Sequence, residues 1–243
     1  MKIYWYRNSK NLIGHRLHDL RISQHLTQRQ LAARMQLAGM EMNEVTILRI
    51  EKGVRFVPDY EVAELAKALG DEETYRTFND RGYWWRNVIS DEGYCHMRDS
   101  KGQWLENFDP FRSGANQHYV EGNAWQLTFF VPQDVPALVE KIGKQRFTDR
   151  LLWGFNQDEA WRYNAPNDQY WDHPVVQGNQ QSMHFAFLFN YADTPWNTQR
   201  WSRSILDRYY GYGIANAYLG DEDQGQMSAW AVLASLGLFQ TDG

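Results

Sequence analysis

Apolar residues recur at helical spacing through the first third of the chain. Ile13, Leu17 and Leu20 predict a helix over roughly residues 11–24. Thr27 is a suitable N-cap for the next helix, QRQLAARMQL, which is expected to end near a glycine. The pattern therefore predicts short amphipathic helices from the start of the chain.

Two further short helices follow in the same pattern. Asn43 is expected to cap EVTILRIEKG, which Gly53 closes, and Asp59 is expected to cap YEVAELAKALG. The inward face of the third helix is predicted to hold Val45, Leu48, Ile47 and the stem of Glu51. Helices of this length bury little apolar area alone, so the four must pack together.

From Tyr75 onward, longer aromatic-rich helices alternate with loops rich in Gly, Asp and Asn. Helices are predicted over roughly 59–90, 123–142, 144–156, 180–192, 194–210 and 226–237. The first of these is expected to run on across residue 70, and the loop 87–111 carries the turn signals of a short hairpin. The predicted fold class is all-α.

Composition and charge change along the chain. Of the 11 Trp, Trp5 alone precedes residue 84. Residues 1–70 carry a net charge of +4 and residues 71–243 carry −9. The basic segment is weakly indicative of a nucleic-acid contact. The aromatic residues either fill a core or form stacking platforms for sugar rings.

Cysteine content and hydropathy exclude several classes of protein. Cys95 is the single cysteine, so an intrachain disulfide and a cysteine-rich zinc site are excluded. The segment MKIYWYRNSKNLIG does not resemble a secretory signal, and no apolar run reaches 18 residues. We therefore expect a cytoplasmic protein without a membrane span.

The segment LTQRQLAARMQLAG…NEVTILRIEKGVRFVPDYEVAELAKALG resembles the Cro/repressor-type (XRE family) helix-turn-helix, over about residues 11–70. The resemblance implies a DNA-binding module over residues 1–70 with double-stranded DNA as partner. The residues placed for phosphate or base contact are Gln28, Asn43, Glu44, Thr46, Arg49, Lys52 and Arg55. The alternative is a protein-interaction module whose charges are solvated, and Glu44 disfavours phosphate contact.

Three loop motifs resemble a second family. EGNAWQ begins at Glu121, NYADTPW ends a segment that contains GNQQSMH, and GDEDQGQMSAW contains Asp221 and Asp223. Together they resemble glycoside hydrolase family 92, the calcium-dependent exo-α-mannosidases. The resemblance runs from about residue 60 to residue 243. It implies a second domain over residues 71–243, which is expected to be a partial (α/α)6-barrel-like helical domain with long loops.

This resemblance implies a mechanism and a set of site residues. An inverting glycosidase uses one carboxylic acid to protonate the leaving oxygen and a second carboxylate to activate water. The resemblance places Glu121 as the general acid and draws the general base from Asp221 and Asp223. The residues expected to contact the sugar are Trp125, Asn179, Gln180 and His184. Calcium is the implied cofactor, although no metal ligands are assigned, and capping of helix N-termini is the alternative role for the carboxylates.

The chain also departs from that family. Relatives usually read GNEPSHH where this chain has GNQQSMH, so Gln180 replaces a glutamate and Met183 a histidine. Family members also have a β-sandwich domain and a complete barrel, whereas about half of the barrel helices are recognisable here. The exposed face of a partial barrel predicts a homo-oligomer or aggregation.

These observations predict a chimeric fusion joined through the helix that contains AELAKALG. Its leading interpretation is a sequence-specific DNA-binding module fused to an incomplete, inactive α-mannosidase-like domain. The alternative is a calcium-dependent inverting exo-α-mannosidase. A third hypothesis is a sugar-sensing regulator in which mannose changes the affinity for DNA.

Overall fold

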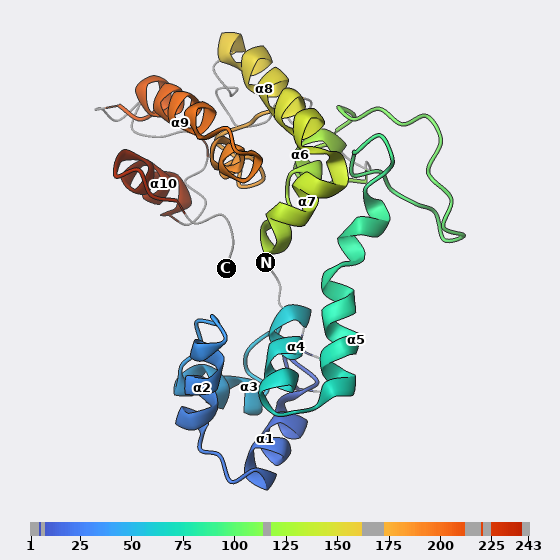
Figure 1. The fold of residues 1–243 in the computed structure, drawn as a ribbon, viewed down its shortest axis with the longest axis vertical. Helices are drawn as coiled ribbons and strands as arrows, with labels where there is room; N and C mark the ends of the chain where they lie inside the picture. The colour runs from blue at the N-terminus through green and yellow to red at the C-terminus, as the bar shows by residue number, and fades with distance from the viewer. Residues whose placement is uncertain are drawn as a thin grey trace. The chain divides into compact units, whose positions relative to one another are not determined.

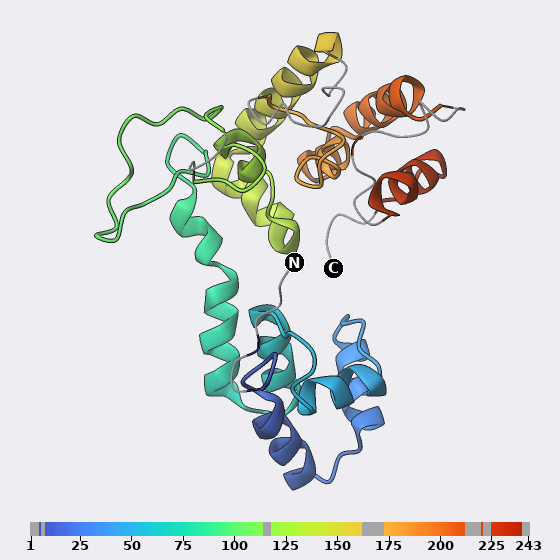
Figure 2. The ribbon, with the colours of Figure 1, turned by 180° about the vertical axis from the view of Figure 1, so that it is seen from behind.

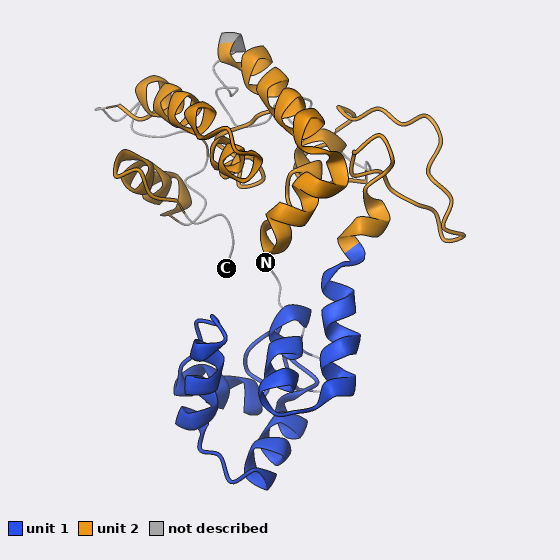
Figure 3. Cartoon of the chain, viewed as in Figure 1, with its two compact units in different colours: residues 1–84 blue, residues 85–243 orange. Residues whose placement is uncertain are grey.

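The structure is a computed structural model that describes residue 5 and residues 8–113, 118–161, 173–211, 220 and 225–239. These described residues are helical, as the sequence predicts, and no named strand occurs among them. The expected hairpin is reduced to two isolated antiparallel bridges, which join Ile89 to Cys95 and Arg98 to Trp104. The chain divides into two compact units, Met1–Trp84 and Trp85–Gly243 (Figure 3).

The first unit contains five described helices (Figure 1). They are α1 (Gly14–Ser23), α2 (Gln28–Leu37), α3 (Glu44–Glu51), α4 (Asp59–Ala68) and α5 (Glu72–Gly82). The predicted caps of α2 and α3 are confirmed. Thr27 forms a capping box with Gln30, and Asn43 accepts a hydrogen bond from the amide of Thr46. Pro58 rather than Asp59 is the N-cap of α4, and Asp59 is its first residue.

The inward face of α3 holds Ile47 and the side chain of Glu51 as predicted, but it differs from the prediction at Val45 and Ile50. Ile47 and Ile50 are fully buried, whereas Val45 is 48% exposed. Ile47 and Ile50 lie three residues apart, so they share one face of the helix, and Val45 lies off that face. They join Leu31 and Met35 of α2 in the core of this unit.

The predicted continuous helix over 59–90 is wrong, because the chain breaks between α4 and α5. Gly70 adopts a positive φ of 71°, a left-handed conformation that glycine reaches without a Cβ penalty. Asp71 then caps α5 by accepting a hydrogen bond from the amide of Thr74. The two helices pack side by side, as both ribbon views show (Figures 1 and 2).

The helical elements described at or beyond the end of the first unit follow in chain order. They are η1 (Trp84–Val88), α6 (Ala124–Thr128), η2 (Pro132–Asp134), α7 (Val135–Ile142), α8 (Lys144–Trp161), η3 (Phe185–Ala192), α9 (Pro195–Tyr209) and α10 (Gln226–Ser235). The predicted helix over 123–142 is interrupted between α6 and α7. Pro132 opens η2 there, and Asp134 caps α7.

The core of the second unit is mainly aromatic. Its largest fully buried side chains are Trp125, Trp201, Trp230, Phe129, Phe147, Phe155, Phe185 and Phe189. Full burial of a large apolar side chain stabilises the fold by about 1.5–3 kcal/mol. These residues therefore serve as core, and the sugar-platform interpretation applies only to exposed aromatic side chains. Within the described residues, no helix is long and apolar enough to cross a membrane.

Candidate active site

Glu121 precedes α6 in an unusual backbone conformation. Its φ is 52°, in the left-handed region that non-glycine residues rarely occupy, and its side chain is exposed. The next residues fold by local rules, because Asn123 caps α6 by accepting a hydrogen bond from the amide of Gln126 at 2.9 Å. A strained residue persists only where its surroundings fix it, and such residues cluster at functional sites.

Three consecutive amide side chains hold the Glu121 loop. Asn179 Nδ2 donates to the carbonyl oxygen of Glu121 at 2.7 Å, and Gln181 Nε2 donates to that of Val120 at 3.2 Å. Gln180 Nε2 lies 3.5 Å from Oε2 of Glu121, at the outer limit of a hydrogen bond. The segment GNQQ therefore fixes the backbone of Glu121 and contacts its carboxylate.

Further hydrogen bonds fix the residues on either side of Glu121. The hydroxyl of Tyr119 donates to the carbonyl oxygen of Cys95 at 2.7 Å. Asn123 Nδ2 and Gln126 Nε2 both donate to the carbonyl oxygen of His173, at 3.0 and 2.7 Å. The carboxylate of Asp158, 1% exposed, accepts from the amide of Val175 and contacts the His173 ring.

Of the residues predicted from the sequence, Asn179 and Gln180 lie at Glu121. Gln181, Asn123, Gln126 and Asp158 are not among the residues predicted from the sequence. The run of amide residues in GNQQ is the feature of the sequence that could have indicated Gln181. Consecutive amide side chains in a non-helical turn can donate hydrogen bonds to two backbone carbonyl oxygens.

Trp125 and His184 lie in the interior. Trp125 is fully buried. Its ring packs against Gly154, where the Cβ of any other residue would lie 2.4 Å from the ring. His184 is buried between aromatic rings and its Nε2–H donates to the carbonyl oxygen of Phe129 at 2.8 Å. Burial lowers the pKa of His184 to about 4, so its ring is neutral at pH 7.

Asp221 and Asp223 lie outside the described residues. Among the residues that the structure does describe, no three His, Cys, Asp or Glu side chains gather as metal ligands. At the Glu121 loop, the described oxygen donors are one carboxylate and neutral amides, and a calcium ion requires six to eight oxygen ligands. This donor set does not fit calcium by itself.

Two of the residues predicted to contact DNA are engaged within the first unit. Gln28 Nε2 donates to Oε2 of Glu51 at 2.7 Å, and Glu51 pairs with Arg21 at 2.5 Å. Arg55 forms a bidentate ion pair with Glu61. The first interaction joins α2 to α3, and the second joins the connection after α3 to α4, so these two side chains have a structural role in this fold.

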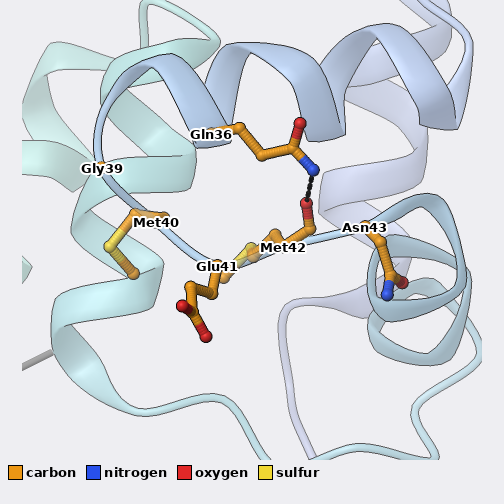
Figure 4. Close-up of a pocket in the computed structure, with 6 residues that line it drawn as sticks. All are labelled: Gln36, Gly39, Met40, Glu41, Met42 and Asn43. Atoms are coloured by element: carbon orange, nitrogen blue, oxygen red, sulfur yellow. Dashed lines mark hydrogen bonds between the residues drawn. The ribbon is translucent and has the colours of Figure 1, made fainter.

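The remaining residues predicted for DNA lie at the N-cap of α3, on α3 and just beyond it. Asn43, Glu44, Arg49 and Lys52 are exposed, and Thr46 is half-buried. A hollow of about 500 Å³ lies on the connection from α2 to α3, and Asn43 is one of its lining residues (Figure 4). The charged residue among its six lining residues is Glu41, and Gln36 Nε2 donates across it to the carbonyl oxygen of Met42 at 2.8 Å. An acidic lining disfavours phosphate.

Between residues 85 and 243, the described elements are helical, and Glu121 is held in the loop just before α6. The profile of the glycosyl hydrolase family 92 catalytic domain matches residues 55–243. The chain therefore belongs to glycosyl hydrolase family 92. The match begins within residues 1–70, where the sequence indicates a helix-turn-helix, and that assignment stays a prediction.

Solved structures agree with this family assignment. A family 92 α-mannosidase from Bacteroides thetaiotaomicron has 36% sequence identity and a TM-score of 0.59, over 72% of this chain and 22% of that chain. A family 92 inverting mannosidase from the same organism has 29% identity and a TM-score of 0.57, over 72% and 25%.

A curated relative, named as an uncharacterized secreted glycosidase of Arthroderma benhamiae, is 25% identical over 208 residues. That alignment covers 76% of this chain and 25% of the relative. The chain thus spans about a quarter of the length of the proteins it matches. The relative is named as secreted, and the cytoplasmic location expected from the sequence stays a prediction.

Proposed function

We propose that this chain carries the general-acid part of a family 92 hydrolase that acts on α-mannosides. The observation that supports this most directly is the fixed, strained backbone of Glu121 beneath an exposed carboxyl group. A general acid must be held within a fraction of an ångström of the leaving oxygen, and a loop tied by Asn179 and Gln181 meets that need.

The proposed reaction inverts the anomeric centre. The carboxylic acid of Glu121 gives its proton to the glycosidic oxygen as the bond from that oxygen to the anomeric carbon breaks. A carboxylate from Asp221 or Asp223 takes a proton from a water that attacks the opposite face of the sugar. The products are one mannose of inverted configuration and a free hydroxyl on the leaving group, so atoms and charge balance.

Gln180 modifies this site. A glutamate there would place a second carboxylate beside Glu121, whereas Gln180 supplies a neutral N–H at 3.5 Å. The site therefore lacks a negative charge that an amide cannot replace. We expect slow turnover for this reason.

The test is release of mannose from a simple α-mannoside, with and without calcium. Wild type is compared with Glu121→Gln, and with Glu140→Gln as a control on an exposed glutamate of α7. Turnover that persists in Glu140→Gln and disappears in Glu121→Gln supports the proposal. Folded wild-type protein without turnover, or turnover equal in Glu121→Gln, contradicts it.

Duplex DNA binding by the first unit is the second candidate. The observation in its favour is that Arg49 and Lys52 are exposed and take no part in the ion pairs described between residues 8 and 84. A specific contact would show affinity that falls steeply with salt and a further loss in Arg49→Ala with Lys52→Ala. Arg76→Ala, which removes an exposed cation paired with Glu72 on α5, is the matched control.

A further inference from the structure

A concave site lies in the unit of residues 85–243. It is a hollow of about 760 Å³ between the first half of α8 and the loop that precedes α6. This volume is within the range of small-molecule sites. Its lining includes neither Glu121 nor the amides that hold Glu121.

One wall of the hollow is an aromatic platform. The ring of Trp153, 44% exposed, lies 5.6 Å from the ring of Phe111 and 6.4 Å from that of Trp125. Trp125 is itself fully buried, so Trp153 is supported from behind by fixed rings. An aromatic ring held in this way offers its face to apolar C–H groups at little cost in side-chain entropy.

A stripe of hydrogen-bonding groups runs beside this platform. Gln145, Asp149 and Trp153 are spaced by four residues and so share one face of α8. Gln145 Nε2 donates to Oδ1 of Asp149 at 2.8 Å, and both side chains are exposed. Apolar surface next to a carboxylate and an amide matches a pyranose, which has a C–H face and hydroxyl groups around its edge.

The two arginines that line the hollow donate hydrogen bonds to the backbone of residues 91–93. Arg146 donates to the carbonyl oxygen of Asp91 at 2.9 Å, and Arg150 donates to those of Glu92 and Gly93. The guanidinium of Arg150 also lies 3.7 Å from the ring centre of Tyr94. These hydrogen bonds hold both guanidinium groups at residues 91–94, and Gln145 and Asp149 are the polar groups on the face of α8 that carries Trp153.

We propose that this hollow is a sugar-binding site for a neutral hexopyranoside, separate from the reacting centre, with Trp153 as platform and Asp149 as hydroxyl acceptor. The choice of α-mannoside as the hexopyranoside rests on the proposed function. Such a site would hold part of a glycan while its terminal residue reaches Glu121, which raises the local concentration of the scissile bond.

The experiment is calorimetric titration of the full chain with methyl α-mannoside. The variants are Trp153→Ala, Trp153→Phe, Asp149→Asn and Glu121→Gln, with Trp84→Ala as the control for loss of an exposed tryptophan of the other unit. Binding is expected to weaken at least tenfold in Trp153→Ala and severalfold in Asp149→Asn. It is expected to stay within twofold of wild type in Trp153→Phe, Glu121→Gln and Trp84→Ala.

Equal affinity in wild type and Trp153→Ala overturns the proposal, as does an absence of binding by folded wild type. Binding that Glu121→Gln abolishes and Trp153→Ala retains also overturns it, because the sugar then occupies the reacting centre alone. If Trp153→Ala fails to fold, as judged by circular dichroism, the affinity of Asp149→Asn decides. Affinity equal to that of wild type then overturns the proposal. Failure of the proposed function is seen separately, as mannose release that does not depend on Glu121.

Discussion

The side-chain amide of Asn179 donates a hydrogen bond to the backbone carbonyl oxygen of Glu121 at 2.7 Å, across 58 residues of sequence. It joins two segments that lie far apart in the sequence, YVEGN and GNQQ. Because Glu121 has a positive φ, this bond holds a conformation that the local sequence does not favour.

Asn179→Ala is expected to reduce mannose release at least tenfold and to lower the free energy of unfolding by about 1 kcal/mol, the net value of one hydrogen bond. The loss of rate exceeds the loss of stability because a small shift of Glu121 misplaces its proton. Urea denaturation and the mannoside assay measure the two effects. Asn156→Ala, at an exposed position on α8, should change neither, and a rate loss no larger than in that control would contradict the positioning role.

Glu121→Gly is expected to stabilise the fold relative to Glu121→Ala by about 1 kcal/mol, while both variants lack turnover. Glycine occupies a φ of 52° without the Cβ penalty that alanine retains. The midpoint of urea denaturation provides the measurement. A glycine variant less stable than the alanine variant would show that the backbone at Glu121 is not strained.

The buried ion pair of the first unit provides a test of that unit alone. Arg21 and Glu51 have side chains only 7% and 5% exposed, and their closest atoms lie 2.5 Å apart. Arg21→Met or Glu51→Leu alone is expected to cost about 3 kcal/mol, because each leaves a buried charge unpaired. The double substitution should cost much less than the sum of the two, in a double-mutant cycle followed by thermal denaturation.

The same pair predicts a pH dependence at low pH. Burial raises the pKa of Glu51, but hydrogen bonds from Arg21 and Gln28 outweigh it, so the pKa is lowered in the folded protein. Stability from Glu51 is therefore present above its unfolded pKa and is lost as the pH falls through the lower folded value. Glu51→Leu should remove this part of the acid dependence.

His184 predicts a second loss of stability on acidification. Its folded pKa of about 4 lies below the ordinary value of 6.5, so the unfolded chain binds a proton first as the pH falls. Stability is full above pH 6.5 and decreases between 6.5 and about 4. The total is on the order of 3 kcal/mol.

His184→Gln keeps a side-chain N–H donor but does not titrate. Its free energy of unfolding should vary less between these pH values than that of wild type. Asn156→Gln, at an exposed position on α8 that does not titrate, serves as the control and should retain the wild-type pH dependence. Equal dependence in wild type and His184→Gln would contradict the role assigned to His184.

The sequence by itself determined the features that depend on neighbouring residues. Thr27 and Asn43 cap the helices that they were predicted to cap, since a capping side chain needs only the next three residues. The helical class and the family also follow from the sequence, because helical periodicity and the motif EGNAWQ at Glu121 are properties of short segments.

The tertiary structure alone decided which side chains are available for function. Gln28 and Arg55 fit a DNA-binding pattern, yet the packing of the helices turns them to Glu51 and Glu61. Trp125 fits a sugar platform, yet it fills the core. Gln181 joins Asn179 at the Glu121 loop through a contact across about sixty residues, which no local pattern encodes. Burial and long-range hydrogen bonds depend on how segments meet, and that is set by the sum of their packing rather than by any one segment.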